Sequence, residues 1–248
     1  MKGAAIVTGA GRRLGRVLAL AAARAGFDVA VHHRASPEDA GETAALVRGH
    51  GREALILAGD LTGPDAPAAL LSAAGALGPV TLLVNSASMF EDDRLETASA
   101  RGLADHMAAN LTAPVLLSQA FAAALPADRE GLIVNIVDQR VWRPNPQFFS
   151  YSLSKAALWH ATRTMAQALA PRIRVNAIGP GPTLPSVHQA PGEFEREAGG
   201  TPLGRPVDPE EVGRALSYLI DAASVTGQMI AVDSGQHLGW LTPDIVQP

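Results

Sequence analysis

The stretch Ala4-Ala-Ile-Val-Thr-Gly-Ala-Gly-Arg-Arg-Leu-Gly15 decides the fold of this 248-residue chain. Its first five residues predict a short buried strand, and the Ala/Leu-rich run that follows it, up to about Gly26, predicts a helix. Three glycines between them allow the backbone to turn tightly and to approach a ligand, while the start of the helix offers free N–H groups to a phosphate. The stretch therefore predicts either a phosphate-binding loop or an ordinary strand-to-helix turn.

A buried apolar run followed by a helical pattern recurs along the whole chain. We expect seven strands, at residues 4–8, 28–32, 53–58, 80–84, 132–137, 173–178 and 228–232. Helical patterns lie between them, and the one at 37–50 begins at a proline and is followed by a glycine. Regular alternation implies βαβ units. We therefore predict one α/β domain over residues 1–248, a Rossmann-type doubly wound parallel sheet with helices on both faces.

Composition narrows the classes of function. The chain is 47% hydrophobic and 18% charged, which is typical of a soluble globular protein with a sizeable core. A net charge of −4 argues against a nucleic-acid partner, which would need a basic face. Cysteine is absent and the histidines lack a metal-ligand spacing, so we expect no disulfide and no metal. We found no apolar run long enough to span a membrane and no signal-peptide pattern, and we expect a cytoplasmic protein.

Tyr151 and Lys155 are four residues apart, so in a helix they lie on one face, one turn apart. An ammonium group beside a phenol lowers the tyrosine pKa from about 10 towards neutrality, which suits a residue that transfers protons near pH 7. Asp138 follows the strand pattern at 132–137, which places a carboxylate at the carboxyl end of a strand, where open α/β sheets hold their ligands. These three residues are our predicted catalytic group.

The end of the second expected strand indicates which nicotinamide cofactor is used. An acidic residue there would bind the ribose 2′-OH of NAD(H), whereas an arginine accommodates the 2′-phosphate of NADP(H). This chain has Val31-His-His-Arg-Ala-Ser36, with no acid before Glu38. Arg34, supported by Arg12 or Ser36, therefore favours NADP(H), and His32 and His33 are lesser candidates.

Together these residues resemble the short-chain dehydrogenase/reductase family over nearly the whole chain. The shared motifs are Thr8-Gly9 to Gly15, Asp60-Leu61, Asn85-Ser-Ala-Ser88, Asn110, Tyr151-Ser-Leu-Ser-Lys155, Pro180-Gly181 and Asp233-Ser-Gly235. The resemblance implies a cofactor site formed by Gly9, Gly11, Arg12, Arg13, Leu14, Gly15, His33, Arg34, Ser36, Asp60, Leu61, Asn85, Ser86, Ala87, Tyr151, Lys155, Pro180 and Gly181. It also implies that Asn110 anchors a water chain to Lys155, and that the protein forms a homo-oligomer, usually a tetramer, through helices around 110–125 and 151–168.

Two positions depart from the common family pattern and match its pteridine reductase branch, which includes dihydromonapterin reductases. Arg13 replaces a glycine of the loop, and Asp138 replaces the catalytic serine. Phe90 matches the aromatic residue on which that branch stacks a pterin. The resemblance therefore implies a substrate site formed by Arg13, Ser88, Phe90, Asp138, Tyr151 and Leu184.

The carboxylate at position 138 bears on the choice of substrate. An ionised carboxylate repels a ketone oxygen but suits N–H donors, or a ring nitrogen that needs a relayed proton. We therefore predict an NADPH-dependent reductase of a small dihydropterin-type substrate, with Tyr151 and Asp138 supplying the proton. The alternatives are a carbonyl or alcohol oxidoreductase, in which Asp138 is protonated or only structural, and a non-catalytic NADP(H) sensor. Phe90 could equally pack in the core or under a lid. We expect residues 182–206, which are rich in glycine and proline, to form an irregular loop that covers the substrate cleft, with Leu184, Val187, His188 and Phe194 as its specificity candidates.

Overall fold

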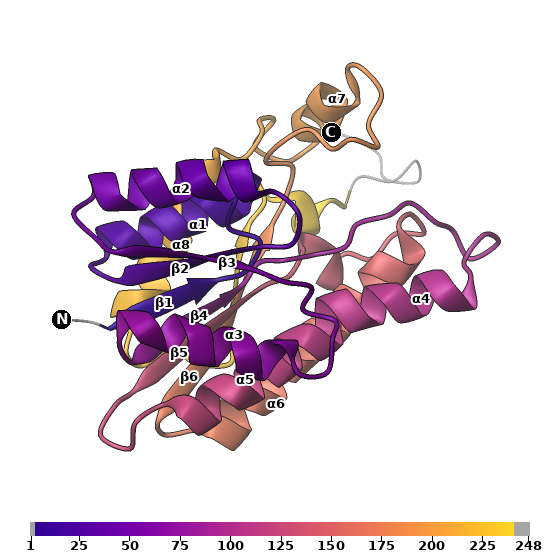
Figure 1. Ribbon diagram of the computed structural model, residues 1–248. Helices are drawn as coiled ribbons and strands as arrows, with labels where there is room; N and C mark the ends of the chain where they lie inside the picture. The colour runs from indigo at the N-terminus through magenta and orange to yellow at the C-terminus, as the bar shows by residue number, and fades with distance from the viewer. Residues whose placement is uncertain (1–2, 241–248) are drawn as a thin grey trace.

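Seven parallel strands form the centre of the protein, and the computed structural model describes residues 3–240 (Figure 1). The strands are β1 (Ala4–Val7), β2 (Asp28–His33), β3 (Ala54–Ala58), β4 (Val80–Asn85), β5 (Gly131–Ile136), β6 (Ile173–Pro180) and β7 (Met229–Val232). Their order in the sheet is β3-β2-β1-β4-β5-β6-β7. The predicted single α/β domain with a doubly wound, seven-stranded sheet is confirmed.

Helices cover both faces of the sheet (Figure 1). One face carries α1 (Arg13–Arg24), α2 (Pro37–Gly49) and α8 (Pro209–Asp221), and the other carries α3 (Ala66–Ala74), α4 (Ala100–Met107), α5 (Ala113–Ala124) and α6 (Phe149–Leu169). Each face has its own hydrophobic core, because successive strand side chains point to opposite sides: Val7 belongs to the α1 side and Ile6 to the α5 side. The aromatic content is low, and alanines of α1 such as Ala19 and Ala22 are fully buried.

Strand order reverses on either side of β1, because β2 follows on one side and β4 on the other. In doubly wound sheets, ligands bind outside the carboxyl ends of the strands at this switch point. The loops after β1, β2, β4, β5 and β6 therefore meet at one edge, and these loops hold nearly all the predicted site residues.

Several elements differ from the sequence prediction. The fifth strand ends at Ile136, so Asp138 lies two residues beyond it, and the two helical patterns after β4 form one continuous helix. A π-helical turn, Ala108–Thr112, joins α4 to α5 within that helix. A short helix, α7 (Glu193–Gly199), lies inside the segment that we expected to be irregular. It was missed because glycines and prolines crowd the sequence around it.

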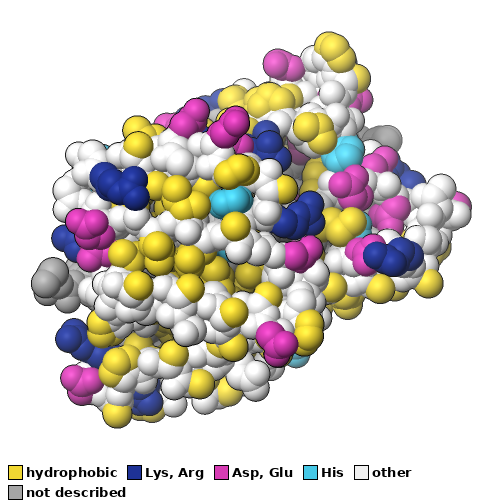
Figure 2. Space-filling view, viewed as in Figure 1, with side chains coloured by type: hydrophobic (Ala, Val, Ile, Leu, Met, Phe, Trp, Pro, Cys, Tyr) yellow, Lys and Arg dark blue, Asp and Glu magenta, His cyan; other side chains and the backbone are white. Residues whose placement is uncertain are grey.

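Hydrophobic side chains are exposed in two regions described here. Figure 2 shows hydrophobic side chains gathered along the sheet edge between α2 and α3, where Ile56 of the edge strand β3 is partly exposed. The continuous helix Ala100–Ala124 is long and apolar enough to span a membrane by length and composition, a test that a helix of a soluble core also passes. Here α5 packs against α3 and β4.

Candidate active site

Close backbone packing explains the glycines after β1. A side chain at Gly15 would bring its Cβ to 2.0 Å from the carbonyl oxygen of Gly9, and one at Gly9 would lie 3.0 Å from the Cα of Ala87. Gly9 also has a φ of +64°, which disfavours other residues. The side-chain hydroxyl of Thr8 accepts hydrogen bonds from the backbone N–H groups of Ser86 and Ala87, both at 2.9 Å. These contacts hold the loops after β1 and β4 together as one wall.

His32 fixes the same loop from the other side. Its ring is buried, and its Nδ1 accepts a hydrogen bond from the N–H of Gly9 at 3.2 Å. Its Nε2 lies 3.0 Å from the carbonyl oxygen of Gly59, so the neutral ring with its proton on Nε2 satisfies both partners. Burial lowers the pKa of His32 and favours this neutral form. His32, a lesser cofactor candidate in the sequence, therefore supports the glycine loop.

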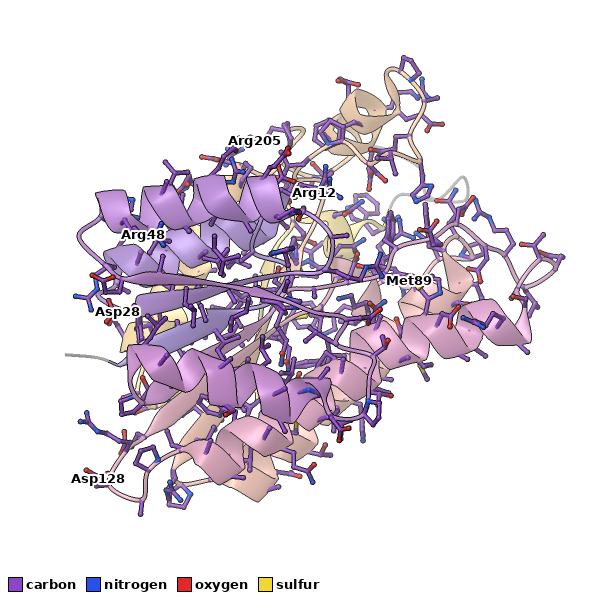
Figure 3. The ribbon with its side chains drawn as sticks, viewed as in Figure 1. Arg12, Asp28, Arg48, Met89, Asp128 and Arg205 are labelled. Atoms are coloured by element: carbon purple, nitrogen blue, oxygen red, sulfur yellow. The ribbon has the colours of Figure 1, made fainter. Side chains whose placement is uncertain are left out.

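Positive charge gathers at the end of β2. Arg34, just after β2, and Arg12, at the start of α1, are both exposed, and Figure 3 shows Arg12 at the end of the sheet opposite to Asp28 and Asp128. Hydrogen bonds from the Thr62 hydroxyl and N–H, together with the charge of Arg34, lower the pKa of Asp60. The buried His33 accepts the N–H of Ser36 at Nδ1. The edge thus combines a glycine cradle, the free N–H groups of α1 and two arginines, which fits a dinucleotide bearing an extra phosphate.

The other predicted cofactor residues lie along the same edge. Leu14 and Leu61 are half-buried beside the loops after β1 and β3. The amide of Asn85 instead donates to Asn135 of β5 at 2.8 Å and ties two strands together. Pro180 and Gly181 lie at the end of β6, where a Cβ on Gly181 would come 2.6 Å from the Cα of Asp233.

Asp138, Tyr151 and Lys155 come together as the sequence predicted. The Tyr151 hydroxyl donates to Oδ2 of Asp138 at 3.0 Å, and both Tyr151 and Lys155 are buried on one face of α6. Lys155 donates from Nζ to the carbonyl oxygen of Ile136 at 2.8 Å, with Nζ 5.6 Å from the centre of the Tyr151 ring. Oδ1 of Asp138 accepts the backbone N–H of Arg140 at 2.9 Å. Asp138 therefore caps the next turn with one oxygen and binds the phenol with the other.

The electrostatics of this group correct one expectation. Burial raises the pKa of Asp138, and burial together with the neighbouring carboxylate raises the pKa of Tyr151 well above its usual value. Burial lowers the pKa of Lys155 to about 8. We expected Lys155 to lower the tyrosine pKa, but its ammonium group binds a carbonyl while the phenol binds a carboxylate. A carboxylate stabilises the protonated phenol, so this arrangement retains a proton.

Asn110 lies in the π-helical turn and is fully buried. Its Oδ1 accepts the N–H of Met89 at 2.7 Å and the hydroxyl of Ser88 at 3.1 Å. Its Nδ2 donates to the Met89 carbonyl at 2.9 Å and to the Ser154 hydroxyl at 3.0 Å. The side chain thus ties the loop after β4 to the helix that carries Tyr151 and Lys155.

Three aromatic rings meet beside Tyr151. Phe90 stacks on Phe148 with ring centres 4.2 Å apart and planes 11° apart, and the Tyr151 ring meets Phe90 edge-on at 4.6 Å. His188 lies edge-on to both phenylalanines, and its Nε2 donates to the Phe90 carbonyl at 2.8 Å. The predicted substrate aromatic Phe90 is therefore at the site, with one ring face covered by Phe148.

The segment 182–206 reaches both sides of the site. Arg13 has a φ of +53° and donates from its guanidinium to the carbonyl oxygens of Pro185 at 2.9 Å and Leu184 at 3.3 Å. We expected Arg13 to lie over phosphate and substrate, but in this structure its guanidinium binds the segment 182–206. Of the specificity candidates in that segment, Val187 is 94% exposed and points to solvent, whereas His188 contacts Phe90.

Sequence reasoning missed two residues of the site. Asp93 accepts hydrogen bonds from the N–H of Ser150 at 2.9 Å and from its hydroxyl, and so caps α6 from the loop after β4. Arg140 lies between Asp138 and Phe148. No local motif marks Asp93, which is 57 residues from its partner. Arg140 could have been noticed only as a charge two positions after a candidate acid.

Among residues 3–240, no cluster of His, Asp or Glu side chains could hold a metal ion.

Comparison with known proteins bears on this geometry. The family model described as "Enoyl-(Acyl carrier protein) reductase" matches residues 9–237. The crystal structure of FolM alternative dihydrofolate reductase 1 from Brucella suis, in complex with NADP, is 48% identical, with a TM-score of 0.94 and 98% of each chain covered. An uncharacterised oxidoreductase of Mycobacterium tuberculosis is 37% identical, with 93% of this chain and 90% of that protein covered. A galactitol 2-dehydrogenase of Cereibacter sphaeroides is 36% identical, with 93% of both covered.

These matches extend over nearly the whole described chain and agree with the sheet order, the glycine loop and the Tyr151–Lys155 spacing. Residue 138, where an aspartate replaces the serine common in the family, is hydrogen-bonded to the tyrosine. The chain belongs to the short-chain dehydrogenase/reductase family of oxidoreductases, and within it resembles the pteridine-reductase-like members.

Proposed function

We propose that this protein reduces a dihydropterin-type substrate with NADPH. The observation that carries the proposal is the partly buried hydrogen bond between Tyr151 and Asp138, next to the Phe90 ring. A carboxyl group in this position suits a nitrogen heterocycle, because in its ionised form it accepts from ring N–H donors and in its protonated form it relays a proton to a ring nitrogen. The Brucella suis relative, whose name is that of a dihydrofolate reductase and which was crystallised with NADP, supports the same substrate class and cofactor.

The cofactor proposal rests on the edge formed by β1 and β2. The glycine loop and the N-terminus of α1 would hold the pyrophosphate, and Arg34 with Arg12 would bind the 2′-phosphate. Lys155 and Pro180 lie at the carboxyl ends of β5 and β6, where the nicotinamide half would lie. When bound, NADPH supplies the hydride that reduces the substrate ring carbon.

Proton supply is the task of the buried pair. With Asp138 ionised, the phenol O–H donates a hydrogen bond to the carboxylate. Burial raises the pKa of Asp138 and makes its protonated form easier to reach, and in that form the carboxyl donates to the phenol oxygen instead. The phenol O–H is then free to donate to the ring nitrogen adjacent to the reduced carbon, and the Asp138 proton replaces it. The positive charge of Lys155 stabilises the negative charge that remains on Asp138.

Substrate binding would use the Phe90 ring, with Ser88, Leu184 and Arg13 around it. Residues 182–206 would act as the cover, because their carbonyls are held by Arg13 on one side and His188 binds the Phe90 loop on the other. A cover that excludes water strengthens the hydrogen bonds beneath it.

The test is the loss of NADPH absorbance with dihydropterins, dihydrofolate and quinonoid dihydropterins, compared with ketones and sugar alcohols. We expect turnover of a dihydropterin, and a fall of about a hundredfold in Asp138→Ser together with a rise in ketone reduction. Asp65→Ser is the matched control, since Asp65 is exposed and its side chain makes no cap hydrogen bond. Unchanged turnover of every substrate in Asp138→Ser would contradict the proposal.

One observation favours a second candidate, a carbonyl or alcohol oxidoreductase. Oδ1 of Asp138 accepts the Arg140 N–H, which is the capping role that leaves the chemistry to Tyr151 and Lys155 alone. The galactitol dehydrogenase relative represents that class. The same substrate panel separates the two functions, and no NADPH consumption with any substrate would favour a non-catalytic NADP(H) sensor.

We further propose that the protein is a cytoplasmic homo-oligomer, a tetramer by family resemblance. Only 33% of the apolar window in the Ala100–Ala124 helix is buried within the described chain, and Leu103 of α4 and Leu153 of α6 are exposed. Burying these side chains against another copy would remove apolar surface from water. Light scattering coupled to size-exclusion chromatography measures the oligomeric state directly, and a monomer would contradict the proposal.

A further inference from the structure

Arg140 has no role in the proton transfer described above, yet it contacts both Asp138 and Phe148. Its backbone N–H donates to Oδ1 of Asp138 at 2.9 Å, and its side-chain Nε lies 3.9 Å from the same oxygen. Its guanidinium carbon lies 5.1 Å from the centre of the Phe148 ring. The side chain is only 12% exposed, so these interactions are weakly screened by solvent.

The same guanidinium holds the loop that carries Phe148. Nη1 of Arg140 donates to the carbonyl oxygen of Gln147 at 3.1 Å and to the side-chain oxygen of Asn145 at 3.3 Å. Phe148, the next residue, has a φ of +51°, which is unfavourable for a phenylalanine and needs support from its surroundings. Its ring then stacks on Phe90 at 4.2 Å. Arg140 therefore supports, through Phe148, the aromatic ring proposed to bind substrate.

We infer that Arg140 is a positioning residue that couples the ionisation of Asp138 to the placement of the Phe90–Phe148 stack. The inference rests on the proposed pterin reduction for its kinetic consequences, though not for its geometry. It assigns a specificity role to a residue outside the family motifs. The planar cation lies against a ring and beside a carboxylate, two contacts that a lysine could not make together.

The charged groups around Asp138 determine whether its pKa rises or falls when Arg140 is replaced. Arg140, Tyr151 and Lys155 face the carboxylate, and all three lower its pKa against the larger, raising effect of burial. Around Phe148, Arg94 is the second cation, 5.9 Å from the ring centre. Removing the charge of Arg140 therefore raises the pKa of Asp138 further. If protonated Asp138 supplies the proton, the pH at which kcat falls on the basic side must rise.

Two variants separate the two roles. Arg140→Met removes both the charge beside Asp138 and the cation against the Phe148 ring. We expect the basic limb of the pH profile of kcat to move up by about one pH unit. We also expect KM for the dihydropterin to rise roughly three- to tenfold. In Arg140→Lys the charge remains without the planar stacking, so the limb should stay near its wild-type pH while KM rises. Arg94→Met is the matched control, because that arginine faces the same ring without facing Asp138, and its limb should not move.

A spectroscopic readout makes the result independent of turnover. The side-chain carboxyl ¹³C signal of Asp138, assigned by its loss in Asp138→Asn, should titrate about one pH unit higher in Arg140→Met than in wild type. Thermal unfolding and NADPH affinity identify a misfolded variant, in which case Arg140→Lys carries the test. An unmoved Asp138 midpoint, or a wild-type KM in both variants, would overturn the inference. A wild-type protein that reduces no dihydropterin would instead contradict the proposed function alone.

Discussion

The two halves of the site are built differently. In the cofactor half, the contacts join loops of strands that are adjacent in the sheet: the N–H of Gly9 donates to the His32 ring, and the N–H of Ser86 donates to the Thr8 hydroxyl. In the proposed substrate half, the contacts join loops to a helix or to one another: Asp93, in the loop after β4, accepts from Ser150 of α6, and His188, in the segment 182–206, donates to the Phe90 carbonyl. Cofactor binding therefore follows from the parallel sheet itself, whereas substrate binding depends on how three loops pack against one another.

The two halves also differ in how their charged side chains are exposed. The cofactor half presents exposed arginines to solvent, where an anionic ligand can reach them. The substrate half buries Asp138, Tyr151 and Lys155 together, and burial is the largest cause of each pKa shift. One half is arranged to bind a fixed charge, and the other to hold a proton. Variants in each half should therefore fail in different measurements.

The largest effect is expected for Tyr151→Phe. Loss of the phenol removes the proton donor, and kcat for the proposed reduction should fall about 10²- to 10⁴-fold. NADPH affinity, measured by fluorescence titration, should remain at the wild-type value because the glycine loop is intact. A parallel loss of cofactor affinity would show that the two halves are not separable.

Arg34→Ala should give the converse pattern. Removing one charge-assisted contact to a 2′-phosphate should weaken NADPH binding about ten- to hundredfold while NADH binding is unchanged. Comparison with Arg12→Ala would show which arginine makes the main contact. Equal weakening of both cofactors would mean that Arg34 does not read the 2′-phosphate.

A smaller effect is expected for His188→Phe, which keeps an aromatic ring but removes the hydrogen bond to the Phe90 carbonyl. We expect KM for the dihydropterin to rise about two- to tenfold, because one hydrogen bond between the cover and the Phe90 loop is lost. Steady-state kinetics at saturating NADPH provide the measurement, and Val187→Phe on the exposed side of the same segment is the control. A change in NADPH affinity would contradict a substrate-side role.

The smallest effect concerns the pH dependence of stability through His32. Burial lowers its pKa in the folded protein, so below about pH 6.5 the unfolded chain binds a proton that the folded chain does not. The free energy of unfolding should fall with decreasing pH in this range, by at most about 1.4 kcal/mol per unit from this residue. Urea unfolding of wild type and His32→Asn between pH 7.5 and 5.5 tests this. A variant with the same slope would exclude His32 as the cause.

Much of the fold and part of the site could be predicted because they depend on local spacing. A continuous apolar run marks a strand that is buried on both faces, and a helix repeats every 3.6 residues, so the βαβ order and the shared face of Tyr151 and Lys155 follow from local spacing. The site at the sheet edge follows from the switch point. Strand boundaries differ from the predicted ones by one or two residues, as at β5. The helix α7 was not predicted, because the glycines and prolines around it are typical of a loop.

The sequence by itself determined the sheet, the glycine loop and the residues that gather at its carboxyl edge, because strand and helix periods act over a few residues. Only the tertiary structure decided that Arg13 binds Leu184 and Pro185, 171 and 172 residues away, and that Phe148 covers one face of Phe90. It also decided the direction of the Tyr151 pKa shift, since burial and the Asp138 carboxylate raise the pKa against the smaller lowering effect of Arg140. These outcomes depend on distances between segments that no local pattern encodes.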